Sequence, residues 1–193
     1  MRKRDFDGYD QMKSWLSAYP ASDYMMPEKQ GNVIPEKFDL RDVGAASPLK
    51  DKGKTPEGIG ICWLFAGIAA LESHLLYTKT AAQEDPLYIQ SELHGAYATF
   101  DISEGDPEYE NPRGRNPMTD SAGKPLFSGW RYMAVNYLTL DTGTVPECLD
   151  PYHKEDIKNG ILQKRKWDLT SGKPGRYYVK EVRYLPEPVA PDD

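Results

Sequence analysis

Cysteine and histidine are scarce in this sequence, and long apolar runs are missing. Two cysteines and three histidines among 193 residues exclude a disulfide-rich secreted miniprotein and offer no zinc-ligand spacing. No apolar run approaches the roughly 18 residues of a membrane-spanning helix, so we expect no membrane span. A net charge of −6 argues against nucleic-acid binding, which favours a basic face. A composition of 39% hydrophobic and 28% charged residues fits a globular domain.

The N-terminal part predicts a leader over residues 1–33. It opens with basic Met1–Arg4, as a signal peptide does, but aspartates follow where the apolar core of a signal peptide should lie. No export signal is therefore visible. Further along, residues 50–60 hold several glycines and a proline, which predicts a flexible loop.

Three helices are predicted downstream of that loop. The strongest spans about 62–77, where leucine and isoleucine recur at helical spacing and the other sides are also apolar, which is typical of a central, buried helix. A second is expected to begin near Ser91, whose hydroxyl can cap the amide of Leu93 or His94, and to end near Phe100. A third fits 129–140.

Residues 101–127 and 177–193 lack helical periodicity. The first stretch is acidic and rich in proline, which predicts a long surface insertion without regular structure. Its carboxylates could bind calcium, although a solvated loop is the simpler interpretation, and no metal site is predicted. The tail has strand composition over 177–185 before further prolines.

Cys62 stands at the predicted start of the central helix, directly after a glycine-bearing loop. The unpaired amides and the positive end of the helix dipole favour a thiolate there, and the same amides can donate to a developing oxyanion. Cys62 could equally be a small buried apolar residue. Position alone leaves both interpretations open.

Several motifs occur in the order found in one protease family. Ile34–Arg41, Gly44–Lys50 and Gly60–Phe65 look like the N-terminal part of papain-like cysteine proteases, whose nucleophile lies in a C-G-S-C-W motif. Further similar stretches are Ser91–Leu93, Ser128–Gly129, Thr144–Glu147 and Asp150–Tyr152. The D-L-R-D and S-E-L-H runs resemble bacterial members most. The resemblance covers about residues 34–152.

The resemblance implies an α+β fold that corresponds mainly to the helical left domain, 34–176, with the first strand of the barrel domain in 177–193. By the same resemblance Cys62 is the nucleophile and Trp63 shields the catalytic pair, although Trp63 also suits plain core packing. Ser128 and Gly129 line the substrate groove, where backbone groups pair with an extended peptide. Gly129 could instead be only a glycine at a helix start.

Two departures from the family pattern affect the predicted catalysis. Lys52 stands where the family has its oxyanion glutamine, and a lysine side chain is less preorganised than an amide. The family's His and Asn lie about 130–150 residues beyond the nucleophile, whereas the last histidine here is His153. His74, His94 and His153 are each expected to be surface or packing residues.

The sequence therefore predicts a cysteine peptidase acting on polypeptides without a cofactor, in which a second chain or a downstream segment supplies His and Asn. A truncated product without activity is a second possibility. A catalytically silent homologue that binds peptides is the alternative from another class. The resemblance implies an extracellular or cell-envelope location, while the sequence leaves the compartment open.

Overall fold

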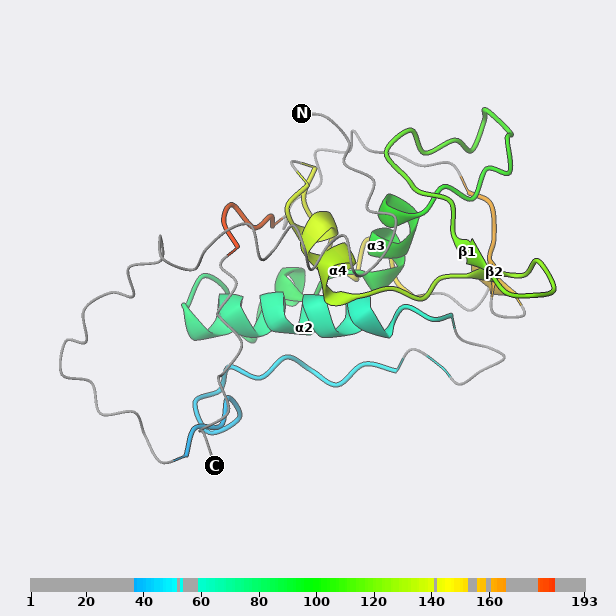
Figure 1. Cartoon of the computed structure of the whole chain (residues 1–193). Helices are drawn as coiled ribbons and strands as arrows, with labels where there is room; N and C mark the ends of the chain where they lie inside the picture. Colours follow the sequence, from blue (N-terminus) through cyan, green and yellow to red (C-terminus); the bar gives the residue numbers. More distant parts are fainter. Residues whose placement is uncertain are drawn as a thin grey trace, which may run out of the picture. The chain divides into compact units, whose positions relative to one another are not determined.

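The central helix α2 (Cys62–Tyr77) organises the described part of the chain (Figure 1). The computed structural model describes residues 37–51, 53, 59–140, 142–152, 156–158, 161–165 and 177–182. All of them except Lys37 belong to one unit, Phe38–Val182. The predicted leader, 1–33, lies outside the described residues.

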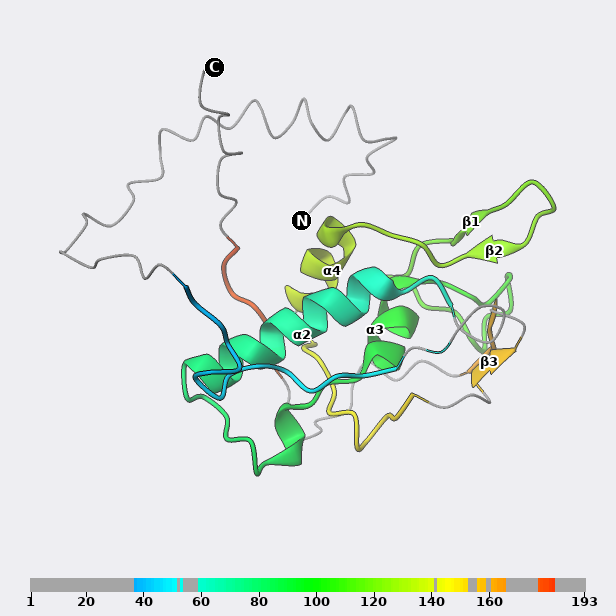
Figure 2. The same cartoon turned by 90° about the horizontal axis from the view of Figure 1, so that it is seen from below.

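Helix α2 has the bounds that the sequence predicts. Leu64 and Ile68 are fully buried, and Leu71 and Leu75 are nearly so. Burial of aliphatic side chains along the length of one helix makes it the centre of the hydrophobic core. Helices α3 (Glu92–Thr99) and α4 (Arg131–Leu138) pack on one side of α2, and residues 38–50 run along the other (Figures 1 and 2).

Helix α3 begins at the predicted cap. The Ser91 hydroxyl oxygen accepts a hydrogen bond from the His94 amide at 2.9 Å, which satisfies one of the free amides of the first turn. Helix α4 is shorter than the predicted 129–140 by two residues at each end. Gly143, with φ of 71°, follows α4 and turns the chain away, since glycine adopts this left-handed conformation without a steric penalty.

Two glycines bring the helices close together. A Cβ atom on Gly67 of α2 would stand 2.6 Å from the Cβ of Ala134 in α4. A Cβ on Gly95 of α3 would stand 2.8 Å from Leu64 Cδ2 of α2. These distances are too short for carbon contacts. Both helix contacts therefore depend on the absence of a side chain.

We expect Gly67→Ala to destabilise the fold by about 1–3 kcal/mol, because the added methyl group overpacks the contact with Ala134. Helix propensity alone would give the opposite sign, about 1 kcal/mol of stabilisation. Urea unfolding of the single variants and of Gly67→Ala/Ala134→Gly measures the coupling. The double variant should return to within about 1 kcal/mol of the wild type. Equal losses in Gly67→Ala and in the double variant would contradict the packing argument.

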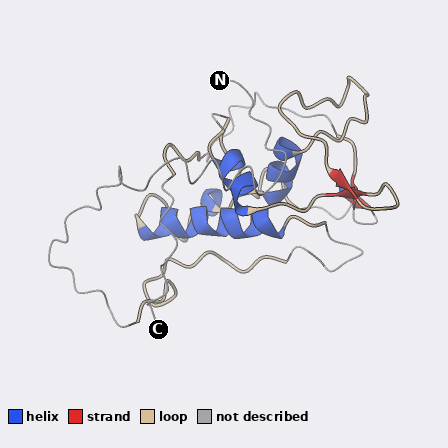
Figure 3. Ribbon diagram, in the orientation of Figure 1, coloured by secondary structure: helices blue, strands red, loops and turns tan. Residues whose placement is uncertain are grey.

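Two small antiparallel sheets accompany the helices, so the described chain is α+β, as predicted (Figure 3). Strands β1 (Met118–Thr119) and β2 (Pro125–Leu126) form one hairpin, and β3 (Ile157–Lys158) and β4 (Ile161–Leu162) form the other. A short 3₁₀ helix, η2 (Pro86–Tyr88), precedes α3. The architecture is compatible with a papain-like helical domain.

The predicted insertion is more ordered than its composition suggests. It contains the β1–β2 hairpin, whose turn is closed by the Asp120 carboxylate accepting from the amides of Ala122 and Lys124, both at 2.9 Å. Asn111 is buried and its side-chain amide donates to the carbonyls of Tyr97 and Ala98 in α3. Hydrogen bonds between Asp or Asn side chains and the backbone order this segment despite its prolines.

The strand predicted over 177–185 is not formed in its described part, 177–182. The carbonyl of Tyr177 accepts from the Thr144 amide at 2.8 Å, and the Val179 amide donates to the Leu138 carbonyl at 2.7 Å. These backbone groups bond to the end of α4 and the turn after it, so they do not pair in a ladder. Residues 177–182 therefore belong to the helical unit.

Candidate active site

Cys62 is the first residue of α2 and its side chain is exposed. Ile61 is the N-cap, and no side chain caps the first turn. The amides of Leu64 and Phe65 both donate to the Ile61 carbonyl, while within the described residues no acceptor lies against the amides of Cys62 and Trp63. The sulfur thus stands beside free N–H groups at the positive end of a 16-residue helix.

The segment Ser128–Gly129 reaches the start of α2 through a close backbone contact. A Cβ on Gly60 would stand 3.0 Å from Ser128 Oγ and 3.2 Å from the Ser128 amide nitrogen. Gly60 lies two residues before Cys62, so the bare glycine lets Ser128 approach the head of the helix. The structure therefore brings together the predicted nucleophile and the predicted groove residues.

Trp63 packs against residues 127–129 and holds them in place. Its side chain is 6% exposed, and its indole N–H donates to the Phe127 carbonyl at 3.0 Å. A Cβ on Gly129 would stand 2.8 Å from Trp63 Nε1 and 2.6 Å from Met133 Sδ. Trp63 is thus a packed core residue that also holds the chain at 127–129. A side chain at position 129 would clash with this packing, so Gly129 does more than begin a helix.

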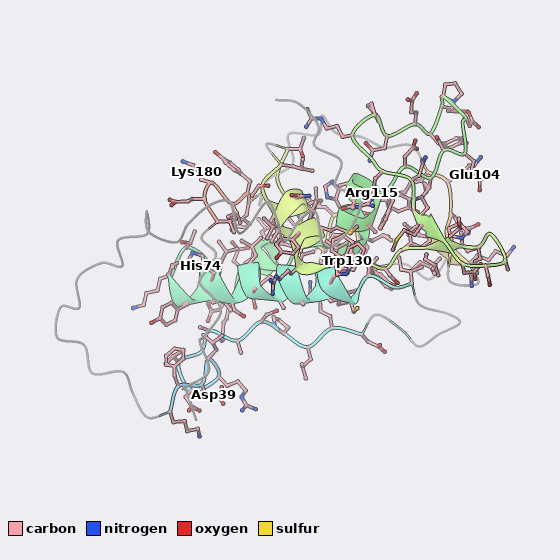
Figure 4. The ribbon with its side chains drawn as sticks, in the orientation of Figure 1. Asp39, His74, Glu104, Arg115, Trp130 and Lys180 are labelled. Carbon is pink, nitrogen blue, oxygen red and sulfur yellow. The ribbon has the colours of Figure 1, made fainter. Side chains whose placement is uncertain are left out.

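The backbone of Ser128 and Gly129 is available for pairing. Within the described part of the chain, no hydrogen bond uses the N–H or C=O groups of these two residues. Trp130, directly after them, is 51% exposed and lies towards the N-terminal end of α2 (Figure 4). An extended peptide can pair with such backbone groups as an added strand does.

The histidines of the described chain do not serve Cys62. His74 is exposed in the last turn of α2, about 18 Å along the helix axis from Cys62 at 1.5 Å per residue, and Figure 4 shows it at the far end from Trp130. His94 is buried, and its Nδ1 lies 2.9 Å from the Tyr137 hydroxyl. His153 and Lys52 lie outside the described residues.

A buried ionic group between Lys50, α2 and α3 was not singled out in the sequence. Lys50 Nζ lies 2.8 Å from Glu72 Oε1 and 2.9 Å from Glu92 Oε1. Glu72 and Glu92 are 0% and 1% exposed. The available signal was Glu72 itself, the only carboxylate in the apolar helix α2, because a buried charge requires a partner.

A hollow of about 860 Å³ opens beside Phe127, between the acidic insertion and strand β4. Its wall includes Ile102, Pro125 and Leu162 as well as Glu104, which pairs with Lys164 at 3.4 Å. Within the described ranges, no group of three or more His, Cys, Asp or Glu side chains is arranged to hold a metal ion. The Asp101 carboxylate instead accepts from the Ser103 amide at 3.0 Å.

Comparison with known proteins finds a limited similarity to a cathepsin. The chain is 33% identical over 82 residues to cathepsin 7 of Rattus norvegicus, which covers 42% of this chain and 23% of the rat protein. The match thus spans about a quarter of that protein's length. Cathepsin 7 bears a papain-family name, so the similarity indicates a distant relation to papain-like cysteine peptidases.

No protein-family model matches the chain, and no solved structure matches it. None of the described helices is both long enough and apolar enough to cross a bilayer.

Proposed function

We propose that the chain carries the nucleophile-bearing part of a papain-like cysteine peptidase, with Cys62 as the nucleophile. The observation that carries this proposal is the exposed sulfur at the uncapped head of α2, beside the approach of Ser128 to Gly60. The similarity to cathepsin 7 supports the same class. We also propose that residues 34–176 form the helical domain of such a peptidase.

In the proposed reaction the Cys62 thiolate attacks the carbonyl carbon of a peptide bond. The amides at the head of α2 donate to the oxygen as it becomes negative, and the family resemblance aligns Lys52 with the residue that supplies a second donor. Collapse of the intermediate breaks the C–N bond, and an imidazole supplied by a second chain or a downstream segment protonates the leaving amine. Water then hydrolyses the thioester.

The substrate is expected to bind as an extended strand along Ser128 and Gly129. Their unused backbone groups supply hydrogen bonds to a peptide main chain, which is a sequence-independent form of recognition. Trp63 holds this segment in place through its hydrogen bond to the Phe127 carbonyl. The exposed ring of Trp130 offers an apolar surface to a substrate side chain.

Labelling with a peptidyl vinyl sulfone tests the proposal without a catalytic histidine. Cys62 and Cys148 are both exposed, so Cys148 serves as an internal control. We expect Cys62 to form its adduct about tenfold faster at pH 6.5, since the peptidyl part of the reagent binds along Ser128 and Gly129 and holds the vinyl group beside the sulfur. Mass spectrometry of tryptic peptides measures both rates, and 8 M urea should abolish the difference.

The same experiment separates the peptidase from a peptide-binding homologue. An unreactive peptide of the same sequence should slow Cys62 labelling by competition if the groove binds substrate. Equal rates at Cys62 and Cys148 together with measurable peptide binding would favour the homologue that binds without cutting. Equal rates without peptide binding would contradict both interpretations.

A further inference from the structure

Four charged side chains meet between residues 45–50, α2, α3 and the turn after Pro146. We call Lys50, Glu72, Glu92 and Glu147 the Lys50 cluster. Lys50 Nζ donates to Glu72 Oε1, to Glu92 Oε1 and, at 2.6 Å, to the Gln90 carbonyl. One ammonium group therefore contacts two carboxyl groups and interacts electrostatically with a third, Glu147, in a buried place where uncompensated charge is costly.

The carboxyl groups of the cluster differ in their hydrogen bonds. Glu72 receives donors from Lys50, from the Ser47 hydroxyl and from the Gln90 amide. By contrast, Glu92 Oε2 and Glu147 Oε2 are buried without a hydrogen-bond partner among the described residues. A carboxylate oxygen without a donor gains from protonation, because the neutral acid has the smaller desolvation cost.

The pKa shifts of Glu92 and Glu147 agree with these missing hydrogen bonds. Burial raises the pKa of Glu92 from 4.5 to about 7, and the positive charge of Lys50 opposes the rise while Glu147 adds to it. Burial also raises the pKa of Glu147. The Glu92 carboxyl therefore keeps its proton in mildly acidic solution.

The other titratable groups near the cluster are two tyrosines of raised pKa, one carboxylate that is already paired and one that is exposed. Burial raises the pKa of Tyr152 to about 12, and burial also raises the pKa of Tyr88 in η2. Asp150 is held by Arg165 through two hydrogen bonds. Asp51 is exposed to water. Glu92, whose pKa is raised to about 7, is thus the group of the cluster that changes charge between about pH 5 and pH 8.

The cluster also anchors a segment of the chain. Lys50 and Ser47 attach residues 45–50 to α2 and α3, and the Ser47 amide adds a bond to Ser73 Oγ at 2.9 Å. We propose that the Lys50 cluster is a pH-sensitive latch, which holds residues 45–50 against α2 most firmly when Glu92 is protonated. This inference does not depend on the chemistry of Cys62.

The expected direction follows from the proton balance. The folded chain keeps the Glu92 proton up to about pH 7, whereas the unfolded chain releases it near pH 4.5. The stabilisation is therefore complete below pH 4.5 and is lost as the pH rises through 7. A difference of this size corresponds to a folding equilibrium constant that falls on the order of a hundredfold between pH 5 and pH 8.

Urea unfolding of the full chain between pH 5 and pH 8.5 tests the latch. The wild type should lose about a hundredfold in the folding constant, and Glu92→Gln should lose much less because its amide does not titrate. Glu84→Gln, which removes an exposed carboxylate, should keep the wild-type slope. The same slope in Glu92→Gln and the wild type would overturn the proposal.

Two further measurements keep the proposal testable if Glu92→Gln fails to fold. Glu147→Gln removes a neighbouring negative charge that raises the pKa of Glu92, so the loss of stability should move to lower pH. A shift to higher pH would overturn the proposal. Hydrogen exchange is the second measurement. After correction for intrinsic exchange, protection over 45–50 should fall with pH more than protection over α4. Equal losses in both segments would overturn the latch.

Discussion

Replacing Lys50 with methionine should destabilise the folded chain by about 3–5 kcal/mol at pH 7.5. Methionine preserves most of the aliphatic stem, so the loss comes from the charge. Without the ammonium group, Glu72 and Glu92 remain buried at 0% and 1% exposure with no counterion from residues 45–50. Removal of one partner from a buried ion pair leaves the other charge uncompensated, which costs more than the pair itself contributes.

Urea unfolding at fixed pH measures this effect. Lys124→Met provides the control, because Lys124 is exposed in the β1–β2 turn and the change should stay within about 0.5 kcal/mol. Lys50→Met/Glu92→Gln should recover part of the loss, since one of the two buried charges is then removed. A destabilisation of Lys50→Met below about 1 kcal/mol, the size of an exposed ion pair, would mean that the cluster is hydrated.

The second large effect is expected at Gly129. In Gly129→Ala the new methyl group would stand 2.6 Å from Met133 Sδ and 2.8 Å from Trp63 Nε1. The Met133 side chain is flexible enough to move, whereas the indole is buried and bonded to the Phe127 carbonyl. Residues 128–129 must therefore shift away from the head of α2. We expect a loss of about 1–3 kcal/mol in stability.

The same shift should reduce Cys62 labelling by the peptidyl vinyl sulfone about tenfold or more, since a displacement of the order of 1 Å disturbs the reacting geometry. Labelling by iodoacetamide, which needs no groove, should change little. Ser128→Ala is the matched control, because it removes an atom from the same segment and adds none. If Gly129→Ala and Ser128→Ala slowed peptidyl labelling equally, the contact with Trp63 would not position the groove.

The helices were predictable because their signals are local. Apolar spacing gives α2 its bounds, and the Ser91 hydroxyl gives α3 its start. The position of Cys62 at the head of α2 follows directly from the same pattern. The two-residue strands were not predictable, because each depends on pairing with a partner set by the turn between them. Likewise, the tail at 177–182 bonds to Thr144 and Leu138, which no local pattern indicates.

The sequence alone determined the central helix, the cysteine at its first turn and the resemblance to papain-like proteases. Periodicity, capping and motif order are properties of neighbouring residues, so they can be recognised without a fold. Only the tertiary structure placed Ser128 against Gly60, packed Gly129 against Trp63 and brought two carboxyl groups to Lys50. Those contacts join residues far apart in the chain, so they depend on how the core packs and on how buried charges are paired.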